Sequence, residues 1–66
     1  MEIIVNGQAR EAADGITIAD LLGELQLNDK PVAVEVNLQL VPRHGHADHR
    51  LAPGDRLEIV TLVGGG

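Results

Sequence analysis

The chain has 66 residues and a net charge of −5 at pH 7, and 44% of its residues are hydrophobic. It contains no cysteine, serine, phenylalanine, tyrosine or tryptophan, which excludes disulfide bonds, thiolate zinc sites and the commonest catalytic nucleophiles. An acidic chain without these aromatic rings is also poorly suited to nucleic acid, because it repels phosphates and cannot stack on bases. We therefore expect a single small domain with an aliphatic core that is not an enzyme and that works with protein partners.

The first twelve residues predict a β-hairpin. Met1, Ile3 and Val5 alternate with Glu2 and Ile4, so Ile3 should face the core and Ile4 the opposite side of the sheet. Asn6-Gly7 is typical of a type I′ turn, which requires positive φ at both central positions. Residues 8–12 are then expected to return as a more polar partner strand.

A helix is predicted over residues 18–26. Thr17 can cap its first turn with Asp20 three residues later. The apolar positions follow the spacing of one helical face and are Ile18, Leu21, Leu22 and Leu25. Pro31 ensures that the helix has ended by about residue 29, because a residue before proline avoids the helical region.

The second half of the chain predicts three more strands, at residues 32–36, 39–41 and 56–62, with a polar, irregular segment at 42–51. One helix against one mixed sheet of four or five strands is an α+β arrangement. With the first and last strands parallel at the centre, this is the β-grasp or ubiquitin-like layout; a small ferredoxin-like half is the alternative. In the predicted core, three helix residues pack against four residues of the sheet: Leu21, Leu22 and Leu25 against Met1, Ile3, Val34 and Ile59.

The last residues, Gly64, Gly65 and Gly66, follow an apolar strand directly. We expect residues 1–63 to form the domain and 64–66 a flexible tail. Glycines without side chains can enter a slot too narrow for any Cβ atom, and they would present the α-carboxylate of Gly66 to the active site of another enzyme. A frayed terminus is the ordinary alternative.

An apolar surface is expected beside this tail. If the first and last strands are neighbours, the outward-facing residues Ile4, Val60 and Leu62 cluster on the sheet face that the helix does not cover. Val63, which follows them, is also expected to contact a partner. Such a cluster suits docking of a protein partner. The alternative is that a small sheet simply exposes some aliphatic side chains.

His44, His46 and His49 lie in the irregular segment 42–51, close to Asp48. Imidazole is a common metal ligand, but a loop of this kind offers no fixed outer shell to orient the rings. We therefore expect a solvated loop and no metal site. Three arginines lie nearby, namely Arg43, Arg50 and Arg56. They form either a small basic patch or weak surface ion pairs with Asp48 and Asp55, and no role is assigned to them.

No apolar run approaches the roughly 20 residues of a membrane span, and the segment after Met1 has no basic region typical of a signal peptide. A cytoplasmic location without membrane contact is expected.

Motifs spread over the whole chain resemble the ThiS family, the sulfur-carrier proteins of thiamine biosynthesis. They are MEIIVNG at 1–7, TIADLL at 17–22, VAVEVN at 32–37 with VPR at 41–43, and GDRLEIV at 54–60 with VGGG at 63–66. The chief departure is a third glycine where the family motif is often written with two. The reactive residue implied by the resemblance is still the last one, Gly66.

The resemblance implies a mechanism and its partners. An E1-like adenylyltransferase of the ThiF type would use ATP and magnesium to adenylate Gly66, a sulfur donor system would convert it to a thiocarboxylate, and a ThiG-type thiazole synthase would take up the sulfur. The chain itself would hold no cofactor. Two rivals remain open at this point: a carrier like the small subunit of molybdopterin synthase, and a β-grasp interaction module with an incidental tail.

Overall fold

The computed structural model describes residues 1–62. The predicted flexible tail, Gly64, Gly65 and Gly66, and the predicted partner-binding residue Val63 lie outside the described residues. The elements follow in the order β1 (Glu2–Val5), β2 (Gln8–Glu11), α1 (Ile18–Glu24), β3 (Val32–Val36), β4 (Gln39–Val41), the 3₁₀ turn η1 (Arg43–Gly45) and β5 (Arg56–Thr61).

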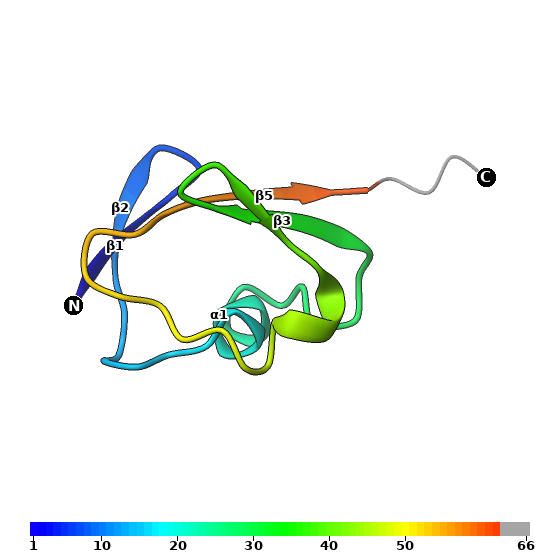
Figure 1. Cartoon of the computed structure of the whole chain (residues 1–66), viewed down its shortest axis with the longest axis horizontal. Helices are drawn as coiled ribbons and strands as arrows, with labels where there is room; N and C mark the ends of the chain where they lie inside the picture. The colour runs from blue at the N-terminus through cyan, green and yellow to red at the C-terminus, as the bar shows by residue number, and fades with distance from the viewer. Residues whose placement is uncertain (63–66) are drawn as a thin grey trace.

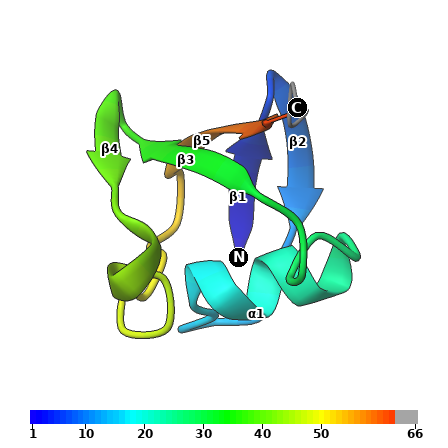
Figure 2. The ribbon, with the colours of Figure 1, turned by 90° about the vertical axis from the view of Figure 1, so that its right-hand side faces the viewer.

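The strands form one five-stranded sheet in the order β2-β1-β5-β3-β4. β1 and β5 are parallel, whereas the pairs β1–β2, β3–β4 and β3–β5 are antiparallel. Helix α1 packs beneath one face of the sheet, as Figures 1 and 2 show from two directions. This is the β-grasp fold, and it confirms the predicted fold class and the central parallel pair.

The core lies between α1 and the covered face of the sheet. Ile3, Leu21 and Val34 are fully buried, and Leu22 and Ile59 are nearly so. Met1 and Leu25, which were expected in the core, are only partly buried at its edge. The predicted alternation of the strands and the apolar face of the helix therefore place the central core residues correctly.

Helix α1 begins as predicted and ends slightly earlier. Thr17 and Asp20 form a reciprocal capping box, with Asp20 N–H donating to Thr17 Oγ1 at 3.1 Å and Thr17 N–H donating to Asp20 Oδ2 at 3.3 Å. The helix ends at Glu24 rather than at the predicted Gln26, because Gln26 takes a left-handed φ of 60°. None of the helices in the described part of the chain is long and apolar enough to span a membrane.

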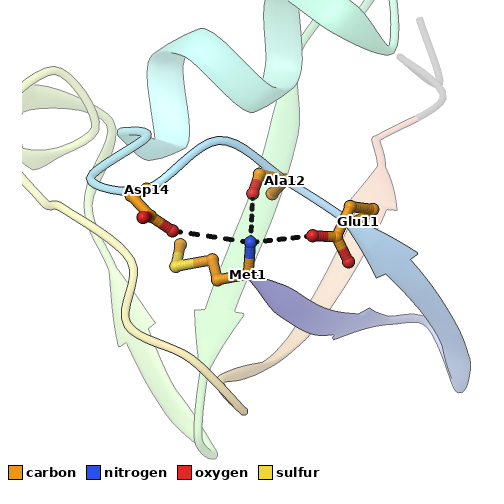
Figure 3. A network of polar contacts seen from close by, with 4 residues as sticks. All are labelled: Met1, Glu11, Ala12 and Asp14. Carbon is orange, nitrogen blue, oxygen red and sulfur yellow. Dashed lines mark hydrogen bonds and ion pairs between the residues drawn. The ribbon is translucent and has the colours of Figure 1, made fainter.

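The amino group of Met1 is held by three oxygens (Figure 3). It donates hydrogen bonds to Glu11 Oε2 at 2.9 Å and to the Ala12 carbonyl at 2.7 Å, and Asp14 Oδ1 lies 3.5 Å away. These contacts fasten the beginning of β1 to the segment that follows β2.

This network predicts that stability decreases at alkaline pH. The pKa of the Met1 amino group is raised above its ordinary value of 8.0, chiefly by its hydrogen bond to Glu11. A raised folded-state pKa stabilises the fold below the unfolded-state pKa, and this contribution is lost as pH rises through the folded-state value. We therefore expect the free energy of unfolding, measured by urea denaturation, to fall as the pH is raised above about 8.

The effect should be small because both carboxylates are exposed to solvent and screened. Glu11→Gln replaces the carboxylate that accepts this hydrogen bond with a neutral amide, which weakens the bond and removes the attraction, so the variant should show a flatter decline over the same pH range. An equal decline in both proteins would show that the network does not cause it.

Candidate functional site

Strand β5 precedes the terminal glycines in the sequence and is paired on both of its edges. On one edge it pairs with β3 from Leu57 to Thr61, and on the other it pairs with β1 at Arg56 and Leu57. Leu57 and Ile59 point into the core, with 1% and 7% of their surface exposed. The strand therefore leaves the sheet from a rigid base, as the carrier interpretation requires.

Two asparagines at hairpin turns also hold β5 through their side chains. Asn6 accepts a hydrogen bond from Ile59 N–H at 2.8 Å and donates one to the Ile59 carbonyl at 3.2 Å. Asn37 accepts a hydrogen bond from Arg56 N–H at 3.0 Å. Both asparagines have a φ of 51°, the left-handed region that asparagine tolerates better than most residues. The sequence predicted both turns, but nothing in it showed that their side chains would bind β5.

Asn6→Asp should therefore destabilise the domain. The carboxylate can still accept from Ile59 N–H, but it cannot donate to the Ile59 carbonyl and places a negative charge against it. We expect a loss of about 1–3 kcal/mol in the free energy of unfolding, measured by urea denaturation. Asn6→Gly is the comparison variant, because glycine keeps the positive φ but removes both hydrogen bonds to Ile59, and it should also destabilise the domain. Wild-type stability in the aspartate variant would contradict the bidentate role of Asn6.

The outer face of the sheet carries the exposed apolar residues expected beside the tail. Val60 and Leu62 have 56% and 51% of their surface exposed. Across β3, Val60 lies opposite Ala33, and Glu58 lies opposite Glu35. Two carboxylates directly opposite one another repel, so the apolar surface is bordered by a concentrated negative charge.

Ile4 does not lie with this pair as the predicted cluster required. It faces the same side of the sheet, but the parallel register sets it beside Arg56. Val60 is four residues further along β5, which corresponds to about 13 Å at the usual rise of a strand. The prediction that Ile4 clusters with Val60 and Leu62 is therefore wrong. The alternation of side chains determines which face of the sheet a residue is on, but not which residue of the neighbouring strand it lies beside.

Ile4 instead lines a shallow groove of about 330 Å³ together with Leu38 and Arg56. Leu38 and Leu40 are 85% and 66% exposed, and sequence reasoning assigned neither of them to a surface. Leu38 could have been noticed, because a large apolar residue in a predicted tight turn cannot reach the core. It has a φ of 70°, which is uncommon for a residue with a branched side chain.

The histidine loop is not uniformly solvated, which corrects the expectation for His46. Its side chain is buried, with 5% of the residue exposed, and its Nε2 lies 2.9 Å from the Val41 carbonyl. Since a carbonyl can only accept, Nε2 carries the proton. The backbone carbonyl of His46 also accepts from Ala19 N–H at 3.0 Å. His46 is therefore a structural link between β4 and α1, while His44 remains exposed.

The described residues, 1–62, contain no group of three histidine, cysteine or acidic residues arranged to hold a metal ion. Within the same residues, the ion pairs found do not involve Arg43, Arg50 or Arg56. Arg50 instead donates from Nη1 to the Gly15 carbonyl at 2.9 Å. The pairs with Asp48 and Asp55 considered from the sequence are therefore not formed there.

Comparison with known proteins places this arrangement in a family. The chain is 42% identical over its full length to part of the thiazole synthase of Paramagnetospirillum magneticum, and it spans 20% of that protein's length. It is 35% identical to the sulfur carrier protein ThiS of Escherichia coli, with both chains covered completely. A crystal structure of the thiamine biosynthesis protein ThiS from Geobacter metallireducens matches with a TM-score of 0.85 at 28% identity, again over all of both chains. The ThiS family model matches residues 3–66, and the chain therefore belongs to the ThiS family.

Proposed function

We propose that this protein is the sulfur carrier for synthesis of the thiamine thiazole and that Gly66 is its reactive residue. The observation that carries the proposal is full-length similarity to the Escherichia coli carrier, joined to a central strand that runs firmly anchored toward the terminal glycines. The link to thiazole synthase is supported by relatives of that name, in which a segment like this chain makes up 20% of the protein.

The proposed chemistry takes place on the α-carboxylate of Gly66. A carboxylate is a poor electrophile, so an E1-like adenylyltransferase first joins it to the α-phosphorus of ATP and releases pyrophosphate. Sulfur from a donor system then replaces AMP at the carbonyl carbon, which leaves a thiocarboxylate. Thiazole synthase takes up this sulfur and returns the carboxylate. The carrier needs no nucleophilic side chain for these steps, which agrees with the absence of cysteine and serine from the sequence.

In this proposal the carrier is not itself an enzyme and binds no cofactor of its own. ATP and magnesium are held by the activating enzyme. The carrier places one carboxylate at a fixed distance from a rigid domain. When the activating enzyme binds that domain, the reacting carboxylate is thereby positioned in its active site.

The test is the intact mass of the protein purified from cells that are making thiamine. A carrier should show a fraction in which sulfur replaces one oxygen, and fragmentation should locate the change at Gly66. The Gly66-deleted chain, isolated in the same way, is the control and should lack the heavier species. Unmodified protein alone, under conditions in which thiazole is being formed, would overturn the proposal.

We also propose that Val60, Leu62 and Val63 form the surface that docks the activating enzyme. Two of these residues are half exposed beside the path to the tail, and the neighbouring Glu35 and Glu58 would gain from a basic group on the partner. Ile4 is not included in this surface, because it lies beside Arg56.

Val60→Asp should weaken activation without harming the fold. The side chain faces solvent, so no core contact is lost, but a charge placed in an apolar interface must be desolvated. We expect the KM for the carrier in ATP–pyrophosphate exchange to rise at least about tenfold. Ala47→Asp adds the same charge at an exposed position of the loop after η1, and it should leave KM near the wild-type value. An unchanged KM for Val60→Asp would place the docking surface elsewhere.

A further inference from the structure

The edge of β5 that faces β1 is left open near the end of the strand. Two hydrogen bonds show which residues of β5 direct their backbone groups toward β3. Asn37 N–H donates to the Arg56 carbonyl at 2.7 Å, and Leu62 N–H donates to the Pro31 carbonyl at 2.9 Å. Residues at even positions of β5 therefore bond to the β3 side. The backbone groups of Leu57, Ile59 and Thr61 point the other way, toward β1.

Pairing on the β1 side stops before Thr61. The Leu57 carbonyl accepts from Asn6 N–H at 2.9 Å, and the Asn6 side chain then satisfies both backbone groups of Ile59. Strand β1 ends at Val5, so the amide of Asn6 acts as the last partner on this edge. Among residues 1–62, nothing bonds to the N–H or the carbonyl of Thr61.

A groove of about 590 Å³ lies beside this open edge, on the side of the sheet that α1 covers. Its lining mixes aliphatic and polar residues: Val5, Leu25, Leu27 and Ile59 are aliphatic, whereas Arg10 and Thr61 are polar. Arg10 donates from Nη2 to Glu24 Oε1 at 3.2 Å, while its Nε is buried with no partner among the described residues.

We propose that an extended segment of the activating enzyme adds to this edge of β5 as a further strand and that its backbone pairs with Thr61. This proposal rests on the carrier function above. Strand addition satisfies an open ladder with main-chain hydrogen bonds, and alternate side chains of the added segment enter a neighbouring pocket. Here an aliphatic side chain of the added segment packs against Leu25, Leu27 and Ile59 in the groove.

The added strand has a consequence for the reaction. Thr61 is the last residue of β5, so pairing there fixes the chain immediately before it leaves for the partner's active site. The edge contact is also separate from the outer surface at Val60 and Leu62, because Thr61 and Val60 point to opposite faces of the sheet. The activating enzyme would therefore hold the strand from its edge as well as from its outer face.

Amide hydrogen exchange tests the proposal on the wild-type chain. In the free protein the Thr61 amide should exchange at least about tenfold faster than the Leu62 amide, which is bonded to Pro31. With saturating adenylyltransferase, exchange at Thr61 should slow by about tenfold or more. If the complex forms and Thr61 exchange is unchanged, strand addition at this edge is wrong while the carrier function stands.

A pair of variants gives the second measurement. Thr61→Pro removes the backbone N–H, and proline is tolerated at strand edges; Thr61→Val keeps the N–H and removes the hydroxyl. We expect KM in ATP–pyrophosphate exchange to be about tenfold higher for the proline variant than for the valine variant. Equal KM values overturn the proposal. Failure of the wild-type carrier to support any exchange would instead overturn the carrier function, and this proposal with it.

Discussion

Deletion of Gly66 is expected to abolish ATP–pyrophosphate exchange by the activating enzyme while the stability of the domain stays unchanged. Removing one residue draws the carboxylate back by up to about 3.6 Å, the reach of one extended residue. A misplacement of about 1 Å can already cost a hundredfold in rate. Stability should not change, because the sheet formed by the described residues does not depend on Gly66, and its hydrogen bonds extend to Leu62, whose N–H bonds to the Pro31 carbonyl.

The extended chain is the matched control for this deletion. One residue appended after Gly66 moves the carboxylate past the α-phosphate of ATP, so exchange should also be lost although every native residue is present. Thermal denaturation of the three chains should give the same midpoint. Equal exchange by all three chains would show that the terminal carboxylate is not the reacting group, and the proposed carrier chemistry would then be wrong.

Leu22→Ala is expected to have the largest effect on stability among the substitutions considered. Leu22 is 4% exposed and belongs to the cluster that joins α1 to the sheet. Removing a buried leucine side chain costs roughly 2–5 kcal/mol, because transfer energy is lost and a cavity remains. A domain of 66 residues buries a smaller share of its surface than a larger domain does and is only marginally stable, so a loss of this size can unfold much of the population at 37 °C.

Leu40→Ala provides the comparison for the same chemical change on the surface. Leu40 is 66% exposed on the edge strand β4, and its truncation should change the free energy of unfolding by no more than about 0.5 kcal/mol. Urea denaturation of both variants measures the difference. Similar values for the two leucines would show that the contact between α1 and the sheet does not determine stability.

Short-range sequence patterns were sufficient to predict most of the fold. Asn6-Gly7 predicted a type I′ turn, and the two residues have φ values of 51° and 82°. The spacing of Leu21 and Leu22 identified the buried face of α1. These features depend on residues close together in the chain, so their signals survive in a single sequence.

Relations between distant segments could not be obtained in this way. How far Ile4 lies from Val60 along the strands depends on the parallel register of β1 and β5. These two strands come from opposite ends of the chain, so no short stretch of sequence indicates their register. The burial of His46 depends on a carbonyl of β4 and on the packing of the loop against α1. The open edge at Thr61 likewise appears only when the length of β1 is compared with that of β5.

The position of β5 bears on how the protein is made. Among residues 1–62 it is the last strand along the chain and the middle strand of the sheet, so the β1–β2 and β3–β4 hairpins remain unconnected until it is inserted between them. Contacts between such distant segments slow folding, and a chain still emerging from the ribosome cannot close its sheet before Thr61 has been released. An activating enzyme that recognises the closed sheet would thereby select finished molecules over nascent or truncated ones.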